Sequence, residues 1–203
     1  MDGNLQVKAG ASLTVQPTTV VKFANSGSTI EVIGTLTAQA SSGNEITFTS
    51  LKDDSVGGDT NNDGTTSTAA KGDWGAIVVR ASGSLNFDYV NLRYGGSGSL
   101  YYGSHYGYYG MIDASSANNA SLTIRHSLLD RSQNAGLFAT GSGIALTLTD
   151  STISNNGTQD SSNQTTFFQH EGVYMDMLRR RSALVSVTST PIVVTECIEM
   201  EVR

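Results

Sequence analysis

The sequence predicts an all-β protein, a parallel β-solenoid of about six coils with loops inserted at its corners. Only 15% of the 203 residues are charged, and 22 glycines accompany only 2 prolines, which is typical of a domain with many strands and turns. Five separated stretches of eight residues share one apolar pattern, and a glycine followed by apolar residues precedes four of them. The length fits a single domain with one core.

The five stretches carry apolar residues at their first, third and eighth positions. They are LTVQPTTV (13–20), LNFDYVNL (85–92), LTIRHSLL (122–129), LTLTDSTI (146–153) and VSVTSTPI (185–192). Alternation, a short break and renewed alternation predict two short strands joined by a tight bend. Stacking the stretches predicts three inward columns. The columns are Leu13, Leu85, Leu122, Leu146 and Val185; Val15, Phe87, Ile124, Leu148 and Val187; and Val20, Leu92, Leu129, Ile153 and Ile192.

A third strand is predicted in each coil after a glycine. The glycines are Gly75, Gly110, Gly136 and Gly172. Three short strands in about 24 residues, the spacing from Leu122 to Leu146, are typical of a solenoid whose coils stack about 4.8 Å apart. A β-sandwich of antiparallel strands also alternates, but it has no reason to repeat column by column. Residues 4–50 are predicted to form the first two coils, with Ile30, Val32, Leu36, Ile46 and Phe48 facing inward.

Several of these units resemble a known family of repeats. SLNFDYVNLRYGG, ASLTIRHSLLDRSQNAG, LTLTDSTISNNG, LTVQPTTVVKF and KGDWGAIVV look like the right-handed parallel β-helix repeats of bacterial surface and secreted proteins, the pectate-lyase-like superfamily. The resemblance covers about residues 4–160. It implies a right-handed coil, an extracellular or cell-surface location, and a polysaccharide or surface protein as partner. The start of the chain lacks the profile of a signal peptide, so we expect either a cytosolic protein or, as the resemblance implies, a fragment or mature form.

Insertion loops are expected at about residues 51–73, 95–109 and 155–171, and residues 193–203 are expected to form a terminal strand or cap. The first loop contains DTNNDG, which matches the opening of a calcium-binding loop. The predicted ligands are the side chains of Asp59, Asn61 and Asp63, the carbonyl of Thr65, and a further carboxylate, for which we choose Asp54.

The match to a calcium loop is incomplete, because Ala70 stands where a full loop places a bidentate glutamate. The neighbouring Asp53 and Asp73 could supply the missing carboxylate in place of Asp54. The alternative is an Asp/Asn/Gly turn cluster that needs no ion. The family resemblance favours calcium.

The second loop is rich in tyrosine. The stretch LYYGSHYGYYG holds Tyr101, Tyr102, Tyr106, Tyr108 and Tyr109, five of the eight tyrosines in the chain. Aromatic rings that carry a hydroxyl group are common in recognition surfaces, which predicts a glycan- or protein-binding loop. The alternative is a loop that folds back over the coil as packing.

Side chains that stack on successive coils are the candidates for an active site. The repeat aligns Tyr89, His126, Asp150 and Ser189 in one column, and Asp88, Arg125, Thr149 and Thr188 in the next. The four candidates for catalysis are Asp88, Arg125, His126 and Asp150, in a polysaccharide lyase or glycoside hydrolase acting on acidic polysaccharide. No motif of such enzymes matches residue by residue. Ordinary charge pairs between stacked strands are the favoured interpretation, and Arg93 and Asp130 are predicted to face each other in the same way.

Net charge, the length of apolar runs and cysteine content limit the possible partners and covalent links of the chain. A net charge of −6 argues against a nucleic-acid partner, since binding phosphates needs clustered Lys and Arg. No run of 18 apolar residues exists, so no membrane insertion is expected. Cys197 is the only cysteine and cannot form an intrachain disulfide. The sequence therefore predicts an extracellular or cell-surface structural or binding module on a calcium-stabilised scaffold, more readily than an enzyme.

Overall fold

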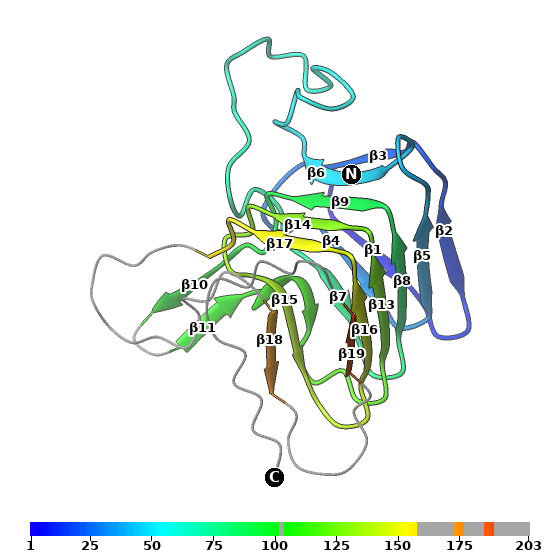
Figure 1. Cartoon of the computed structure of the whole chain (residues 1–203). Helices are drawn as coiled ribbons and strands as arrows, with labels where there is room; N and C mark the ends of the chain where they lie inside the picture. Colours follow the sequence, from blue (N-terminus) through cyan, green and yellow to red (C-terminus); the bar gives the residue numbers. More distant parts are fainter. Residues whose placement is uncertain (102–103, 158–172, 177–184, 189–203) are drawn as a thin grey trace.

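The protein is a right-handed parallel β-helix (Figure 1). A computed structural model describes residues 1–101, 104–157, 173–176 and 185–188. These residues form nineteen β-strands and no helix. Consequently, the described part of the chain contains no helix that could cross a membrane.

Three parallel sheets form the walls of the coil, and each coil adds one strand to each sheet in the order A, B, C. Sheet A contains β1 (Asn4–Val7), β4 (Thr29–Val32), β7 (Ile77–Val79), β12 (Gly110–Ala114), β15 (Ala135–Thr140) and β18 (Val173–Asp176). Sheet B contains β2 (Ser12–Val15), β5 (Thr35–Gln39), β8 (Ser84–Asp88), β13 (Ser121–Arg125), β16 (Ala145–Thr149) and β19 (Val185–Thr188). Sheet C contains β3 (Val20–Phe23), β6 (Ile46–Ser50), β9 (Val90–Arg93), β14 (Leu128–Asp130) and β17 (Thr152–Ser154).

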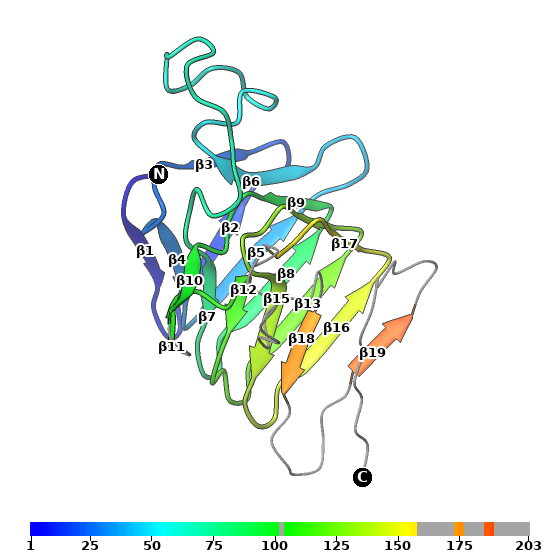
Figure 2. The same cartoon turned by 90° about the vertical axis from the view of Figure 1, so that its left-hand side faces the viewer.

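This order makes five complete coils, and β18 and β19 add two strands of a sixth, in agreement with the predicted number. Figure 2 shows the strands of successive coils lying side by side. Residues 4–50 form the first two coils, as predicted.

The predicted columns of sheet B are confirmed. The first column runs through Leu13, Leu36, Leu85, Leu122, Leu146 and Val185, and the second through Val15, Ala38, Phe87, Ile124, Leu148 and Val187. The leucines from Leu36 to Leu146 in the first column are at most 1% exposed. The outward residues between the columns are mostly Thr, Ser and Asn, which suits a sheet with one solvated face.

The third column is correct except at its first member. Phe48, Leu92, Leu129 and Ile153 are in register in sheet C, and Val21 precedes them. Val20 was predicted here but pairs with Thr47 and is 36% exposed. The corner before β3 has four residues, 16–19, whereas Tyr89 alone separates β8 from β9, so the octet pattern slips by one residue in the first coil. Ile192 lies outside the described residues.

The tight corners between sheets B and C depend on residues with positive φ. Tyr89, His126 and Asp150 occupy this position in three successive coils, with φ of 54°, 45° and 50°. A left-handed residue bends the chain sharply from one sheet into the next within one or two residues, at some conformational cost. Serine hydroxyls tie neighbouring corners together: Ser127 Oγ accepts from the amide of Val90 at 3.1 Å and donates to a backbone carbonyl.

Two insertions that the structure describes in full or nearly in full leave the coil between sheets C and A. Residues 51–76 connect β6 to β7 and project beyond the strands (Figure 1). Residues 94–109 connect β9 to β12 and contain an antiparallel hairpin, β10 (Gly98–Tyr101) and β11 (Ser104–Gly107), which the sequence did not predict. Of the insertion expected at 155–171, only residues 155–157 are described, and the expected terminal strand at 193–203 lies outside the described residues.

Candidate functional site

The loop at residues 51–73 is fastened to the coil at both ends. Ser50 donates to Asp73 at 2.8 Å, and Lys52 Nζ pairs with the same carboxylate at 2.9 Å. Thr49 on β6 donates to Asp53 at 2.6 Å. Lys22 Nζ on β3 donates to the carbonyl of Gly58 at 2.6 Å. The first part of the loop therefore lies against sheet C.

Asp53 is a buried carboxylate at the base of this loop, only 3% exposed. Burial by itself raises the pKa of Asp53, but hydrogen bonds from Ser55 and Thr49, together with the charge of Arg93, lower the pKa below its ordinary value. The Arg93 guanidinium lies 4.0 Å from the Asp53 carboxylate. Asp53 is thus an ionised anchor for the loop, with its oxygens occupied.

The DTNNDG stretch forms a compact turn around the Asp59 carboxylate. Asp59 Oδ1 accepts from the amide of Asp63 at 3.2 Å, and Oδ2 accepts from the amide of Gly64 at 2.8 Å. Asn62 and Gly64 have φ of 57° and 67°, which allows the chain to fold back on itself. Asn61 Nδ2 donates to Asp63 Oδ2 at 2.7 Å. The turn brings three of the predicted ligand side chains to the same side.

Side-chain oxygens converge inside this turn. One carboxylate oxygen from each of Asp54, Asp59 and Asp63 lies within 4.8 Å of the others. In addition, Oδ1 of Asp54, of Asn61 and of Asp63 is buried and has no hydrogen-bond partner among the residues that the structure describes. Buried acceptors without a donor are costly, and like charges at this separation repel each other. An ion bound at this point would remove both penalties.

The donor set fits a hard divalent cation. All candidate donors are carboxylate or amide oxygens, which Ca²⁺ prefers, and ligand distances of about 2.3–2.6 Å allow opposite oxygens to lie as far apart as these do. Of the three nearby carboxylates that could complete the set, the structure brings in Asp54. Asp53 and Asp73 are engaged in the hydrogen bonds at the loop base. Thr65 is exposed at the turn that follows the cluster.

The tyrosine-rich stretch is only partly described. Tyr102 lies outside the described residues, and the side chains of Tyr101 and Tyr106 are not among those described. Tyr108 and Tyr109 are half-buried over sheet A, and the ring of Tyr109 stacks on Phe138 with centroids 4.6 Å apart. Tyr109 therefore fits the packing alternative, whereas Tyr108 lines a hollow.

The four candidate catalytic residues lie along one exposed corner. His126 Nδ1 is 2.8 Å from Asp88 Oδ1, and Nε2 is 3.8 Å from Asp150 Oδ2. The imidazole also stacks on Tyr89, with centroids 4.6 Å apart. Arg125 is exposed and has no ion pair within the described part of the chain. The structure thus brings three of the four residues together, as a ladder of side chains in contact.

Arg93 and Asp130 are neighbours in the register of sheet C, as predicted, but they do not form an ion pair. Arg93 turns toward Asp53, and its buried Nε has no hydrogen-bond partner within the described part of the chain. Asp130 pairs instead with Arg131 and accepts from Ser154 at 3.1 Å. The insertion over sheet C has therefore redirected a side chain that the repeat alone would leave facing its neighbour.

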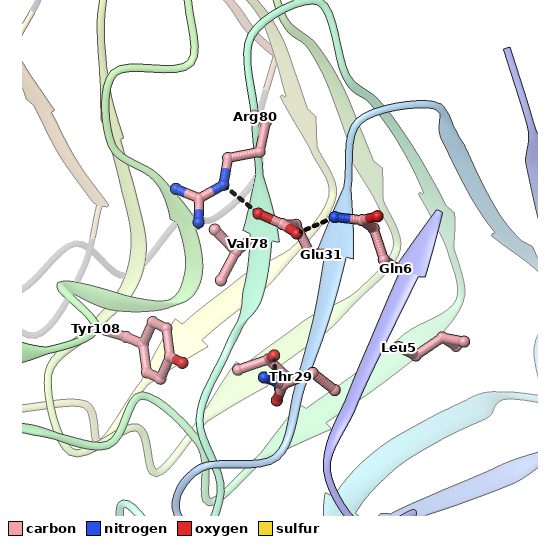
Figure 3. A pocket seen from close by; sticks show the side chains of 8 residues that line it. Leu5, Gln6, Thr29, Glu31, Val78, Arg80 and Tyr108 are labelled. Atoms are coloured by element: carbon pink, nitrogen blue, oxygen red, sulfur yellow. Dashed lines mark hydrogen bonds and ion pairs between the residues drawn. The ribbon is translucent and has the colours of Figure 1, made fainter. Parts of the chain in front are cut away.

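Sequence reasoning missed a hollow on the outer face of sheet A. The hollow measures about 400 Å³ and is lined mainly by outward side chains of β1, β4 and β7, with Tyr108 at its side (Figure 3). The candidate catalytic corner on sheet B lines neither this hollow nor the smaller one beside β3. The residues that line the hollow come from three different coils and from an insertion, so no single stretch of the sequence marks them.

Together, the fold and these sites define a parallel β-helix with a candidate cation-binding loop and a polar hollow. Comparisons of the chain with protein-family models, with curated proteins and with solved structures find no match.

Proposed function

We propose that the chain is a non-enzymatic module of an extracellular or cell-surface protein. The β-helix acts as a rigid scaffold, a Ca²⁺ ion orders the loop at 51–73, and the scaffold presents a surface that recognises a glycan or a protein. The repeat units quoted above support membership of the pectate-lyase-like superfamily as part of this proposal.

One observation carries the calcium proposal: the three buried, unpartnered oxygens of Asp54, Asn61 and Asp63, beside the carboxylate of Asp59. A turn cluster that needed no ion would direct these acceptors to water or to donors. Here hydrogen bonds hold both oxygens of Asp59 and Oδ2 of Asp63 in place, while the three Oδ1 atoms named above remain without a donor among the described residues. The arrangement resembles a preformed ligand cage.

A cation in this loop would act on the fold rather than on a reaction. Asp54 directly follows Asp53, which is hydrogen-bonded to β6, while Asp59 and Asp63 belong to the loop tip. Binding would therefore connect the tip to the fixed base of the loop. If the module is extracellular, a Kd of about 10⁻⁴–10⁻³ M would suffice, as in other extracellular calcium-binding modules.

Catalysis at the Asp88, Arg125, His126 and Asp150 corner is the less favoured alternative. The His126 and Asp150 side chains are 40% and 53% exposed, and neither of the two hollows described above lies at this corner. Asp88 and His126 already satisfy each other. These contacts support a structural ladder on the surface of the coil.

Calorimetric titration of Ca²⁺ into chelator-treated protein tests the proposal. We expect heat of binding, a rise in Tm, and a stabilisation of about 2.7 kcal/mol when the free Ca²⁺ concentration is 100 times Kd. Asp54→Ala and Asp63→Ala should abolish the effect. Thr60→Ala, an exposed position inside the same turn, is the matched control and should bind normally. No heat and no change in Tm for the unmodified chain would reject a calcium site.

A further inference from the structure

The hollow on sheet A is built from three successive strands. Gln6 on β1, Glu31 on β4 and Val78 on β7 are in register, so their side chains point outward in one row. Arg80, just after β7, joins the same row from the side (Figure 3). A volume of about 400 Å³ lies within the range of about 300–1,000 Å³ typical of small-ligand sites.

The carboxylate of Glu31 is held from both sides. Gln6 Nε2 donates to Oε2 at 2.6 Å, and Arg80 Nε donates to Oε1 at 2.6 Å. Those two hydrogen bonds lower the pKa of Glu31, so this group stays ionised and neutralises Arg80. The hollow therefore has no net positive charge with which to attract an anion, and a carboxylate on a ligand would meet the charge of Glu31.

Polar groups remain available around this ion pair. Within the described part of the chain, the two terminal nitrogens of Arg80, Oε1 of Gln6 and Nδ2 of Asn4 have no hydrogen-bond partner. Arg80 supplies donors at one end of the row and Gln6 an acceptor at the other, while Asn4, which pairs in register with Thr29, supplies a further donor beside the row. Adjacent hydroxyl groups, each both a donor and an acceptor, match this mixture of donors and an acceptor better than a carboxylate, which only accepts.

Tyr108 adds an aromatic wall whose position is fixed by the fold. Its amide donates to Ser97 at 2.8 Å, and its carbonyl accepts from Asn134 Nδ2 at 2.7 Å. A Cβ atom at Gly75 would lie 2.8 Å from Tyr108 Cε2, so glycine leaves room for the ring. Leu5, 41% exposed, lies across the hollow (Figure 3). Aromatic faces stack on the C–H faces of sugar rings.

We infer that this hollow is a subsite for an uncharged sugar unit of a glycan, with Tyr108 as the stacking platform and Arg80, Gln6 and Asn4 as partners of ring hydroxyls. The inference rests on the proposed recognition function and specifies its surface and ligand class. It selects neutral over acidic sugars, because Glu31 cancels the charge of Arg80 and opposes a second carboxylate.

Calorimetric titration with defined oligosaccharides tests the inference. The probes are hexasaccharides of β-1,4-glucan, β-1,3-glucan and β-1,4-mannan, and hexagalacturonate as the acidic competitor. We expect at least one neutral probe to bind and hexagalacturonate to bind more weakly. Tyr108→Ala and Gln6→Ala should each weaken neutral binding about tenfold. Glu31→Gln should improve binding of hexagalacturonate, because it removes the opposing charge.

A matched control comes from sheet B. Gln39→Ala removes the same side-chain type as Gln6→Ala from an exposed position on another face and should leave binding unchanged. Circular dichroism of each variant separates loss of the site from loss of the fold. Binding that survives both Tyr108→Ala and Gln6→Ala would place the ligand elsewhere, tighter binding of hexagalacturonate would overturn the ligand class, and no binding of any probe would overturn the inference.

The result of the sugar-binding test is independent of the calcium proposal. No residue that lines the hollow belongs to the loop at 51–73. Sugar titrations run both with Ca²⁺ and with EDTA therefore distinguish the two proposals. Calcium binding without sugar binding would contradict only the sugar subsite. Sugar binding without calcium binding would contradict only the calcium site.

Discussion

Trp74 stacks on Phe23 with ring centroids 4.1 Å apart and an interplanar angle of 7°. Both side chains are fully buried. Trp74 directly follows the loop at 51–73, and its indole Nε1 donates to the carbonyl of Arg93 at 2.7 Å. One side chain thus joins the end of the candidate cation-binding loop to strand β3 of the first coil and to strand β9 of the third.

Truncation of this tryptophan should be among the most damaging single changes in the chain. We expect Trp74→Ala to lower the free energy of unfolding by about 3–5 kcal/mol, because it empties a large buried volume. Trp74→Phe keeps a stacked ring but leaves the Arg93 carbonyl without its donor, which costs about 1–3 kcal/mol. Urea unfolding followed by circular dichroism measures both. A smaller loss for Trp74→Ala than for Trp74→Phe would contradict the packing seen here.

Asp53 should make stability depend on acid pH. Its folded pKa lies below the value in the unfolded chain, so its contribution is present above that ordinary value of about 3.9 and is lost as pH falls toward the folded pKa. Asp53→Asn should remove this part of the pH dependence. Urea midpoints compared at neutral pH and below about pH 4 measure it. Asp2→Asn, at an exposed position, is the control, and equal acid sensitivity in Asp53→Asn and the unmodified chain would disprove the anchor role.

The contact between Asp88 and His126 should contribute little to stability. Their side chains are 28% and 40% exposed, and exposed ion pairs typically contribute about 0.2–1 kcal/mol. A double-mutant cycle with Asp88→Ala and His126→Ala should give a coupling energy in that range, decreasing as salt is added. A coupling above about 2 kcal/mol, unaffected by salt, would mean that this corner is a more specialised site than a surface ladder.

Periodicity made the inner face of the protein predictable. A side chain on a strand points inward or outward according to its position, so Leu85, Leu122 and Leu146 could be aligned without coordinates, and they stack as expected. The same reasoning placed Val20 inward, although Val21 occupies that position. The periodicity fails there because the length of the corner varies between coils. The alternation of side chains within a strand carries no information about the length of the corner that follows.

The cation cluster was predictable in part, because three of its members belong to one short motif. Alternation within DTNNDG identified Asp59, Asn61 and Asp63; the structure brings carboxylate oxygens of Asp59 and Asp63 together with Asp54 and leaves Asn61 Oδ1 buried without a partner among the described residues. The distinction among Asp53, Asp54 and Asp73 depends on which carboxylates the coil already uses. Hydrogen bonds to Thr49 and Ser50 decide this, and those contacts exist only after the loop has folded against sheet C.

The sequence by itself determined the coil, the inward columns and the composition of the cation loop, since each depends on residues a few positions apart and on the two-residue period of a strand. Only the tertiary structure decided the hollow on sheet A. Gln6, Glu31, Arg80 and Tyr108 are separated by tens of residues and meet because successive coils stack in register while an insertion folds across them. Because each turn of the coil places a strand beside the strand of the previous turn, residues far apart in the sequence lie side by side on one face. The lengths of the insertions decide which of these residues meet.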